Sequence, residues 1–303
     1  MCLMKSLKLY IILLFSIPYM LGMNEAIAQV KVQVVTKTIN KSIQWSRDIS
    51  LQLTGERAEI HCTTHSQNTI DFKIEIIAEN KDKKTAESDL NKMKWINRIY
   101  GKTIYLRNYV EIARGETRPQ SDLKVIYTIV VPEACNINIV NYFGRIYVSN
   151  AHSTLSIESK FCPISLKNIT GSVNVDSYLG DISADNIDGT IKLITDQSDI
   201  DINGISGSLN LQSNLASINI GGINNPDRIN IQASKSKLML ETGDFTKFSF
   251  KLKLANATIN KPDTMKLNFL KKDNAKIQAQ FNAETNYPLI NIELNTGTLT
   301  IVN

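Results

Sequence analysis

The chain has 303 residues and a formal net charge of +5 at neutral pH, which is mild for this size. Its basic residues are scattered, and aromatic residues are not interleaved with them as on a nucleic-acid-binding platform. We therefore expect no nucleic-acid partner and interpret the charge as an ordinary solvated surface.

Residues 1–28 have the pattern of a secretory signal peptide. Two lysines precede a short apolar core at residues 9–21, and residues 26–28 form a small-residue cleavage site before Gln29. The apolar run is short for a membrane span, so an uncleaved anchor is the less favoured alternative. Cys2 precedes the apolar core, unlike a lipoprotein cysteine. We expect an exported chain without a lipid anchor and without a transmembrane segment in its mature form.

A first coil is predicted at residues 47–62. The pair Ile49 and Leu51 is followed nine residues later by Ala58 and Ile60, which is the spacing of the repeat further along the chain. Aligning Ile49 with Ile137 makes this coil the first of the same stack.

An insertion then separates the first coil from the repeat. Alternation of apolar and polar residues predicts strands near 70–76, 103–112 and 123–131, and a short amphipathic helix is predicted at 85–97. We expect this strand–helix–strand unit to cover the open end of the stack, since unpaired strand edges invite aggregation.

Apolar residues recur every 18 positions from Ile137 to Ile220 and alternate with polar residues, which is the period of a strand. The columns include Ile137, Leu155, Val173, Ile191 and Leu209; Ile146, Ile164, Ile182, Ile200 and Ile218; Ile169, Ile187, Ile205 and Ile223; and Phe143, Phe161, Leu179 and Leu215. We predict a mainly β protein, a parallel β-solenoid of about 18–20 residues per coil with these columns inside. Their spacing excludes a hexapeptide helix, and the glycine–aspartate pattern of calcium-binding β-rolls is absent.

The period loosens after Gly222. Apolar pairs are expected to continue the stack as further coils with variable turns: Leu238/Leu240, Phe248/Phe250, Ala257/Ile259, Leu267/Phe269, Ile277/Ala279, Ile290/Ile292 and Leu299/Ile301. We divide the chain into a signal peptide (1–28), a first coil with an inserted α+β capping unit (29–135) and a repeat region (136–303). Residues 40–303 would form one continuous domain.

Three cysteines remain after removal of the signal peptide. Cys162 falls in a corner column of small residues and is interpreted as a packed hydrophobe. Cys62 ends the first coil and Cys135 precedes the next one, so a disulfide between them at the base of the insertion is a hypothesis. His61, Cys62 and His65 lie close in sequence, but strand alternation turns His61 and Cys62 to opposite faces, and we expect no metal site.

No catalytic or phosphate-binding motif is present, and no cofactor is expected. Asp181 and Asp199 are one period apart and form a conceivable cation site, although a solvated outer column is the favoured interpretation. Tyr142 and Tyr178 share another outer column, with Lys160 between them, and are a candidate ligand-contact surface beside the simpler interpretation of surface decoration.

The stretch from Val131 to Val148, with its Tyr142-Phe143-Gly144 turn, and the later turn Tyr178-Leu179-Gly180-Asp181-Ile182 resemble the putative-adhesin family of exported bacterial β-solenoid domains. The resemblance covers about residues 40–300. It implies a right-handed solenoid at the cell surface or in the periplasm, and it supplies no catalytic residues. Arg145 replaces the acid of the first turn, and the coil that begins at Phe161 departs further.

From these observations we expect a non-enzymatic exported protein that presents a rigid surface for adhesion or binding, with a cell-surface glycan or an envelope protein as partner. A periplasmic structural or signalling accessory is the first alternative. A carbohydrate-active β-helix enzyme is the second, and it would require acids and aromatic residues gathered on one face.

Overall fold

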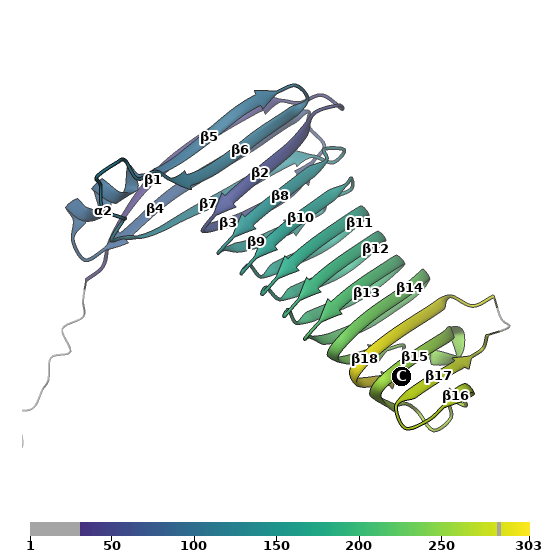
Figure 1. Ribbon diagram of the computed structural model, residues 1–303. Helices are drawn as coiled ribbons and strands as arrows, with labels where there is room; N and C mark the ends of the chain where they lie inside the picture. The colour runs from purple at the N-terminus through teal and green to yellow at the C-terminus, as the bar shows by residue number, and fades with distance from the viewer. Residues whose placement is uncertain (1–30, 284–285) are drawn as a thin grey trace, which may run out of the picture.

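The computed structural model describes residues 31–283 and 286–303 (Figure 1). The predicted signal peptide, including Cys2, lies outside these residues. The described chain is mainly β, with an 18-stranded sheet, one short α-helix and one turn of 3-10 helix. Within the described ranges, no helix has the length and apolar character needed to span a bilayer.

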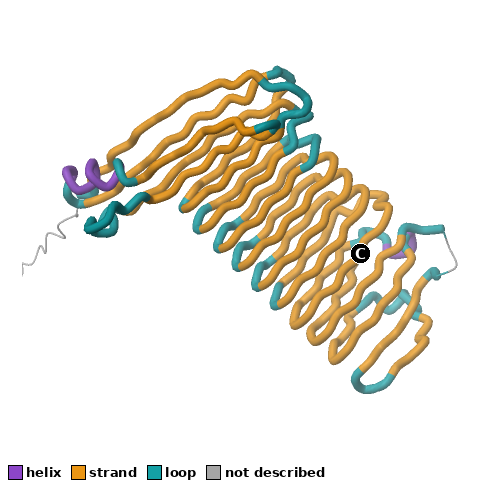
Figure 2. The backbone as a smooth tube through the Cα atoms, turned by 45° about the horizontal axis from the view of Figure 1, so that its top comes forward, coloured by secondary structure: helices purple, strands orange, loops and turns teal. Residues whose placement is uncertain are grey.

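The centre of the molecule is a row of strands that pass one another at intervals of 18 residues (Figures 1 and 2). These strands are β8 (Ile137–Tyr142), β9 (Arg145–Ser149), β10 (Leu155–Lys160), β11 (Ile164–Tyr178), β12 (Ile182–Asp196), β13 (Ile200–Asn214) and β14 (Ser217–Glu241). They pair in parallel, so that Ile137, Leu155 and Val173 lie side by side. The predicted columns of the 18-residue period are therefore present.

The interior of this row is aliphatic because alternate side chains of each strand point inward. The column through Ile191 is at most 2% exposed, and the column through Ile187 is buried from Ile169 to Ile223. Burial of each such side chain contributes roughly 1.5–3 kcal/mol before the entropy cost of ordering the chain. A single coil could not bury the side chains of its inner face, so these residues are buried only when neighbouring coils stack on one another.

The predicted interior position of the Phe143 column is wrong. Phe143, Phe161 and Leu215 are 58%, 43% and 46% exposed, and they sit at turns between strands with φ of 59°, 57° and 55°. This left-handed conformation points the side chain away from the core at a corner where the chain reverses. Period alone identifies equivalent residues but not the direction of a side chain in a turn.

The opposite corner also uses left-handed residues, but here they are asparagines. Asn150, Asn168 and Asn186 have φ between 52° and 57°. Asn168 Nδ2 donates to Asn150 Oδ1 at 3.2 Å, and Asn186 Nδ2 donates to Asn168 Oδ1 at 2.9 Å. Asparagine tolerates this backbone conformation better than other non-glycine residues, and its amide links one coil to the next.

The N-terminal region extends the sheet beyond the first coil. Its elements are β1 (Gln33–Gln44), β2 (Ser50–Glu56), β3 (Ala58–His65), β4 (Thr69–Asn80), α2 (Lys83–Leu90), β5 (Met93–Tyr100), β6 (Thr103–Val110) and β7 (Asp122–Pro132). β2 pairs with β8 on one side and β6 on the other, and β3 lies between β9 and β7 in the same way. The insertion thus places strands against the first coil, with α2 at the outer end (Figure 1).

Two details of the predicted N-terminal region are corrected. The helix ends at Leu90, and Met93 to Asn97 belong to β5, which pairs antiparallel with β6. The first coil aligns Leu51, rather than Ile49, with Ile137. This register places Arg57 at the corner of Phe143, and both residues have positive φ.

The helix is fastened to the loop before β7 through one carboxylate. Asp89 is 3% exposed and accepts hydrogen bonds from the backbone N–H of Gln120 at 2.8 Å and of Ser121 at 2.9 Å. The Ser121 hydroxyl and Lys92 Nζ also donate to it. Burial alone would raise the pKa of Asp89, but these donors outweigh burial and hold its pKa below the usual value.

The C-terminal end departs from the predicted sequence of coils. Its elements are η1 (Phe245–Lys247), β15 (Ser249–Asn260), β16 (Asn268–Lys272), β17 (Lys276–Phe281) and β18 (Leu289–Val302). The last strand, β18, lies in parallel between β14 and β15, while β17 pairs antiparallel with β15 and β16 antiparallel with β17. The sheet is therefore mixed rather than wholly parallel, since β1–β4, β4–β7 and β5–β6 are also antiparallel.

Candidate functional site

One face of the stack carries a continuous outward row of side chains, which we call the outer column. Lys160 lies beside Tyr142 on one side and beside Tyr178 on the other. Successive register pairs continue the row to Asp196, Asn214, Ser234 and Asn295. The structure therefore brings the predicted Tyr142 and Tyr178 into one row, and it extends that row toward the C-terminal end.

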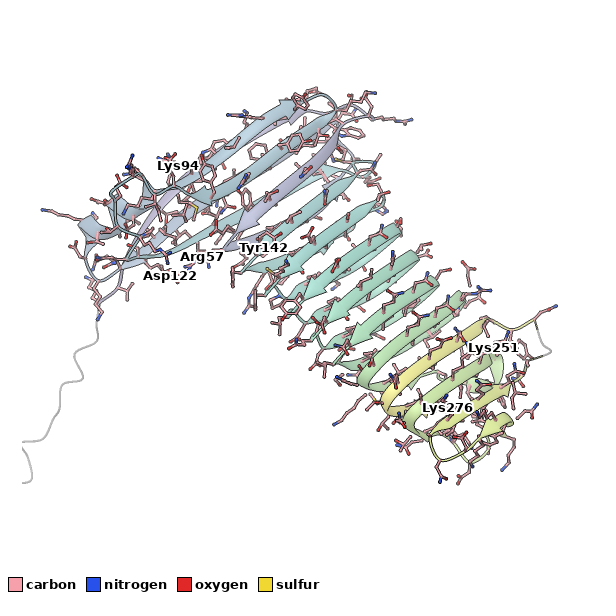
Figure 3. All side chains as sticks on the ribbon, in the orientation of Figure 1. Arg57, Lys94, Asp122, Tyr142, Lys251 and Lys276 are labelled. Atoms are coloured by element: carbon pink, nitrogen blue, oxygen red, sulfur yellow. The ribbon has the colours of Figure 1, made fainter. Side chains whose placement is uncertain are left out.

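The N-terminal end of the outer column is aromatic. Lys160 Nζ lies 5.8 Å from the centre of the Tyr142 ring, and the Tyr142 hydroxyl donates to Glu158 Oε1 at 3.2 Å. Partial burial and then the Glu158 charge raise the pKa of Tyr142. Figure 3 shows Tyr142 at the side of the stack, near the junction with the N-terminal strands.

The exposed corner adds aromatic area that the sequence interpretation missed. The rings of Phe143 and Phe161 are stacked, with centres 4.9 Å apart and planes 3° apart. Tyr178 meets Phe161 edge-on at 5.9 Å. Phe143, Phe161 and Tyr178 thus form one cluster. Together with Tyr142, which precedes Phe143 in the chain, we call it the aromatic cluster.

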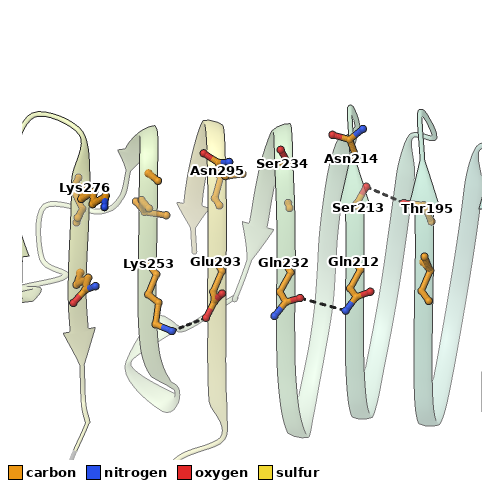
Figure 4. Close-up of a pocket in the computed structure, with 17 residues that line it drawn as sticks. Thr195, Gln212, Ser213, Asn214, Gln232, Ser234, Lys253, Lys276, Glu293 and Asn295 are labelled. Carbon is orange, nitrogen blue, oxygen red and sulfur yellow. Dashed lines mark hydrogen bonds and ion pairs between the residues drawn. The ribbon is translucent and has the colours of Figure 1, made fainter.

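A polar groove of about 730 Å³ opens on the same face at the C-terminal end. Figure 4 shows amide and hydroxyl side chains on neighbouring strands, with Lys253 and Lys276 at the left of the view. Gln212 Nε2 donates to Gln232 Oε1 at 3.3 Å, and Lys253 Nζ lies 2.7 Å from Glu293 Oε1. The two glutamines belong to β13 and β14, and the ion pair joins β15 to β18.

The lining of the groove is rich in side chains that form hydrogen bonds. None of the 17 residues that line it is histidine or cysteine, so the groove holds no serine–histidine or cysteine–histidine pair. Amide side chains offer donors and acceptors together, and residues such as Ile194 and Ile277 add apolar surface. The sequence does not predict this groove, because β18, which carries Glu293 and Asn295, lies between β14 and β15 and so out of chain order.

The stacked aspartates have a backbone role. Asp181 Oδ1 accepts a hydrogen bond from the N–H of Asp199 at 3.1 Å, and Asp199 Oδ1 accepts one from the N–H of Ser217 at 2.8 Å. Across residues 31–283 and 286–303, no group of three or more His, Cys, Asp or Glu side chains is placed to hold a metal ion. The carboxylates join consecutive turns of the stack.

The three cysteines of the described chain, Cys62, Cys135 and Cys162, are buried free thiols in this structure. Burial raises the pKa of Cys62 to about 12, and the neighbouring Cys135 contributes in the same direction. Burial likewise raises the pKa of Cys135 to about 11. The effect of Cys135 on Cys62 places the two thiols in one part of the core, and their pairing stays a prediction.

The two histidines near Cys62 have other partners. His61 Nε2 lies 2.8 Å from Glu59 Oε1, and its ring stacks on Tyr147 at 4.8 Å. His65 Nε2 lies 2.7 Å from the carbonyl oxygen of Thr69. These two residues are therefore surface structure of β3, directed away from the buried Cys62.

No protein-family model and no curated protein matches this chain. Among solved structures, a "putative lipid binding protein" from Parabacteroides distasonis ATCC 8503 is similar with a TM-score of 0.51 and 13% identity, over 88% of this chain and 97% of that one.

Two solved structures whose names refer to adhesion are similar to this chain with lower TM-scores. A "putative adhesin" from Bacteroides fragilis NCTC 9343 has a TM-score of 0.46 and 13% identity, over 88% of this chain and 97% of that one. A "putative cell adhesion protein" from Clostridium sporogenes ATCC 15579 has a TM-score of 0.26 and 11% identity, over 88% and 99%. Proteins with adhesin names are thus among those this chain is similar to, in keeping with the resemblance in the sequence, and at these identities the likeness is one of fold alone.

Proposed function

We propose that this protein is a non-enzymatic exported binding protein, adhesin-like, that presents one face of a right-handed β-solenoid to an extended ligand. Residues 1–28 would direct export, residues 29–135 would contain the first coil and its capping insertion, and residues 136–303 would carry the binding face. The observation that supports this most directly is the continuity of the outer column from the aromatic cluster to the polar groove.

The ligand class that fits this face is a glycan. Sugar rings pack their C–H faces on aromatic side chains, and the aromatic cluster offers Phe143 at 58% exposure and Tyr178 at 36%. Sugar hydroxyls both donate and accept hydrogen bonds, as do the side-chain amides of Gln212 and Gln232. A chain of sugars lying across the strands would meet one coil about every 4.8 Å. The strands hold these side chains in fixed positions, which lowers the entropy cost of binding.

A glycan array followed by calorimetry on the tightest-binding glycan tests this proposal. The double variant Gln212→Ala/Gln232→Ala is expected to weaken binding about tenfold, because each net hydrogen bond is worth roughly 0.5–1.5 kcal/mol. Tyr178→Ala is expected to weaken it to a similar degree through lost stacking. Asn219→Ala is the matched control, because Asn219 is a partly exposed amide outside the groove and the aromatic cluster.

Equal loss in the control and the groove variants would contradict a site on this face, as would an array without a hit. Shortened glycan products after incubation would instead favour the carbohydrate-active enzyme. Binding of an envelope protein in place of any glycan would favour the periplasmic accessory. The name of the Parabacteroides neighbour supports a binding role and does not distinguish among these partners.

We also propose that Cys62 and Cys135 pair in the exported protein. Maleimide should label neither residue in the folded chain within minutes, because a disulfide has no thiol to react and, in any unpaired fraction, burial raises the pKa of both thiols and leaves little thiolate near neutral pH. Unfolding in guanidinium without reductant should then expose one reactive thiol in the processed chain, that of Cys162. Three reactive thiols after unfolding would show that the disulfide is absent, and rapid labelling of the folded chain would contradict the buried positions.

A further inference from the structure

The C-terminal end of the molecule carries an exposed hairpin that the binding face does not use. We define the C-terminal hairpin as residues 260–281, which contain β16 and β17. Residues 268–276 are exposed without interruption. Among the strands of the described residues, β16 pairs with β17 alone, and it lies at the end of the molecule opposite α2 (Figure 1).

Two large apolar side chains protrude together from this hairpin. Phe269 is 40% exposed and Leu270 is 60% exposed. The pairing of β16 with β17 is irregular between Phe269 and Lys271, so Leu270 has no partner residue in β17. A bulge of this kind redirects a side chain that a regular strand would place differently. The preceding loop is held in place by Met265, which is fully buried.

The C-terminal hairpin that carries the apolar pair is rich in lysine. The C-terminal hairpin contains five lysines and two aspartates, whereas residues 137–225 contain eight acidic and four basic residues. Lys272 Nζ lies 4.7 Å from the centre of the Phe269 ring. Figure 3 shows Lys251 and Lys276 at this same end. Positive charge is therefore concentrated where the apolar side chains protrude.

We propose that the C-terminal hairpin docks the protein on an anionic lipid bilayer. Phe269 and Leu270 would enter the boundary between headgroups and acyl chains, and the lysines would face the lipid phosphates. Their long side chains can keep the ammonium groups at headgroup level. A nucleic acid fits less well, because Leu270 offers no ring for stacking on a base. Self-association through β16 is disfavoured by its length of five residues and by its lysines.

Vesicle co-sedimentation of the processed chain, starting at Gln29, tests this docking. The probes are vesicles of phosphatidylcholine and vesicles of equal parts phosphatidylcholine and phosphatidylglycerol. We expect binding to the anionic vesicles alone, weakening as salt rises from roughly 0.1 to 0.5 M. Phe269→Ser/Leu270→Ser should weaken binding at least about tenfold. Lys266→Gln/Lys272→Gln should weaken it about 30-fold, since each lysine near an anionic surface changes affinity about fivefold.

Matched variants elsewhere on the molecule decide whether the C-terminal hairpin is responsible. Lys81→Gln/Lys84→Gln removes two exposed lysines near α2, and Phe143→Ser/Phe161→Ser removes two exposed rings from the aromatic cluster. Both should bind vesicles like the unaltered chain, and circular dichroism should show all variants folded. Equal binding to both vesicle types, no binding, or equal loss in the controls would overturn the proposal. An unaltered chain that binds anionic vesicles but no glycan would count against the binding face only.

Discussion

Replacing Ile191 with aspartate is expected to destroy the folded stack. Ile191 is 1% exposed and lies between Val173 and Leu209 in the parallel register. The change removes about 1.5–3 kcal/mol of apolar burial and places a carboxylate where it has no partner. The combined loss should exceed about 4 kcal/mol, a large part of the stability of a typical domain. By circular dichroism, the thermal midpoint should fall by at least about 8 °C, or the variant should accumulate as insoluble protein.

The neighbouring residue supplies the control for this experiment. Lys192 follows Ile191 in β12, is exposed, and points to the outer face. Lys192→Asp introduces the same side chain one residue away and should change the free energy of unfolding by no more than about 0.5 kcal/mol. Similar losses in both variants would contradict the inward and outward assignment of this strand, and with it the predicted aliphatic column.

The straight parts of the strands were predictable from the sequence because a buried apolar residue is required at the same positions of every coil. Ile137, Leu155 and Val173 are all aliphatic and occupy equivalent buried positions, so their recurrence in the sequence reveals the register of the strands. Alternation within each strand then separates core from surface. Polar outer residues such as Asn174 and Asn210 follow by the same rule.

Turns did not follow the same rule. Phe143 and Phe161 recur with the core period, yet they occupy left-handed corners and point outward. The period shows which residues of different coils are equivalent. The direction of a side chain at a corner depends instead on the backbone angle φ, which the type of residue does not determine. The equivalent positions in other coils are occupied by Arg57, Gln197 and Lys235, all with positive φ. These polar residues were the feature of the sequence that indicated an exposed corner.

The groove was out of reach of sequence reasoning for a topological reason. Chain order predicts that β15 follows β14 in space, but β18 lies between them. Glu293 of β18 therefore forms an ion pair with Lys253 of β15, although the two residues are 40 positions apart in the sequence. The groove depends on this contact between strands that are not consecutive. The aromatic end of the same face was partly predictable, because Tyr142, Lys160 and Tyr178 belong to coils that are consecutive in both sequence and space.

The second large effect is expected from a glycine ladder at one corner of the stack. Gly171, Gly189 and Gly207 are in register, with φ of +103°, +131° and +94°. A Cβ on Gly189 would overlap the carbonyl oxygen of Gly171 in the previous coil. Gly189→Ala therefore combines an unfavourable backbone conformation, worth about 1–3 kcal/mol, with a clash against a backbone atom that cannot move alone. We expect a total loss of at least about 3 kcal/mol and a thermal midpoint lower by about 6 °C or more.

Gly243→Ala is the control at a positive-φ glycine without a clash. Gly243 also has positive φ, at +67°, but no atom lies within 4 Å of its added Cβ. Its substitution should cost only about 1 kcal/mol, the strain of a left-handed alanine. If Gly189→Ala cost no more than Gly243→Ala, consecutive coils would not approach as closely at this corner as the structure places them. The difference between the two variants combines the clash with the larger backbone strain expected at φ +131° than at +67°.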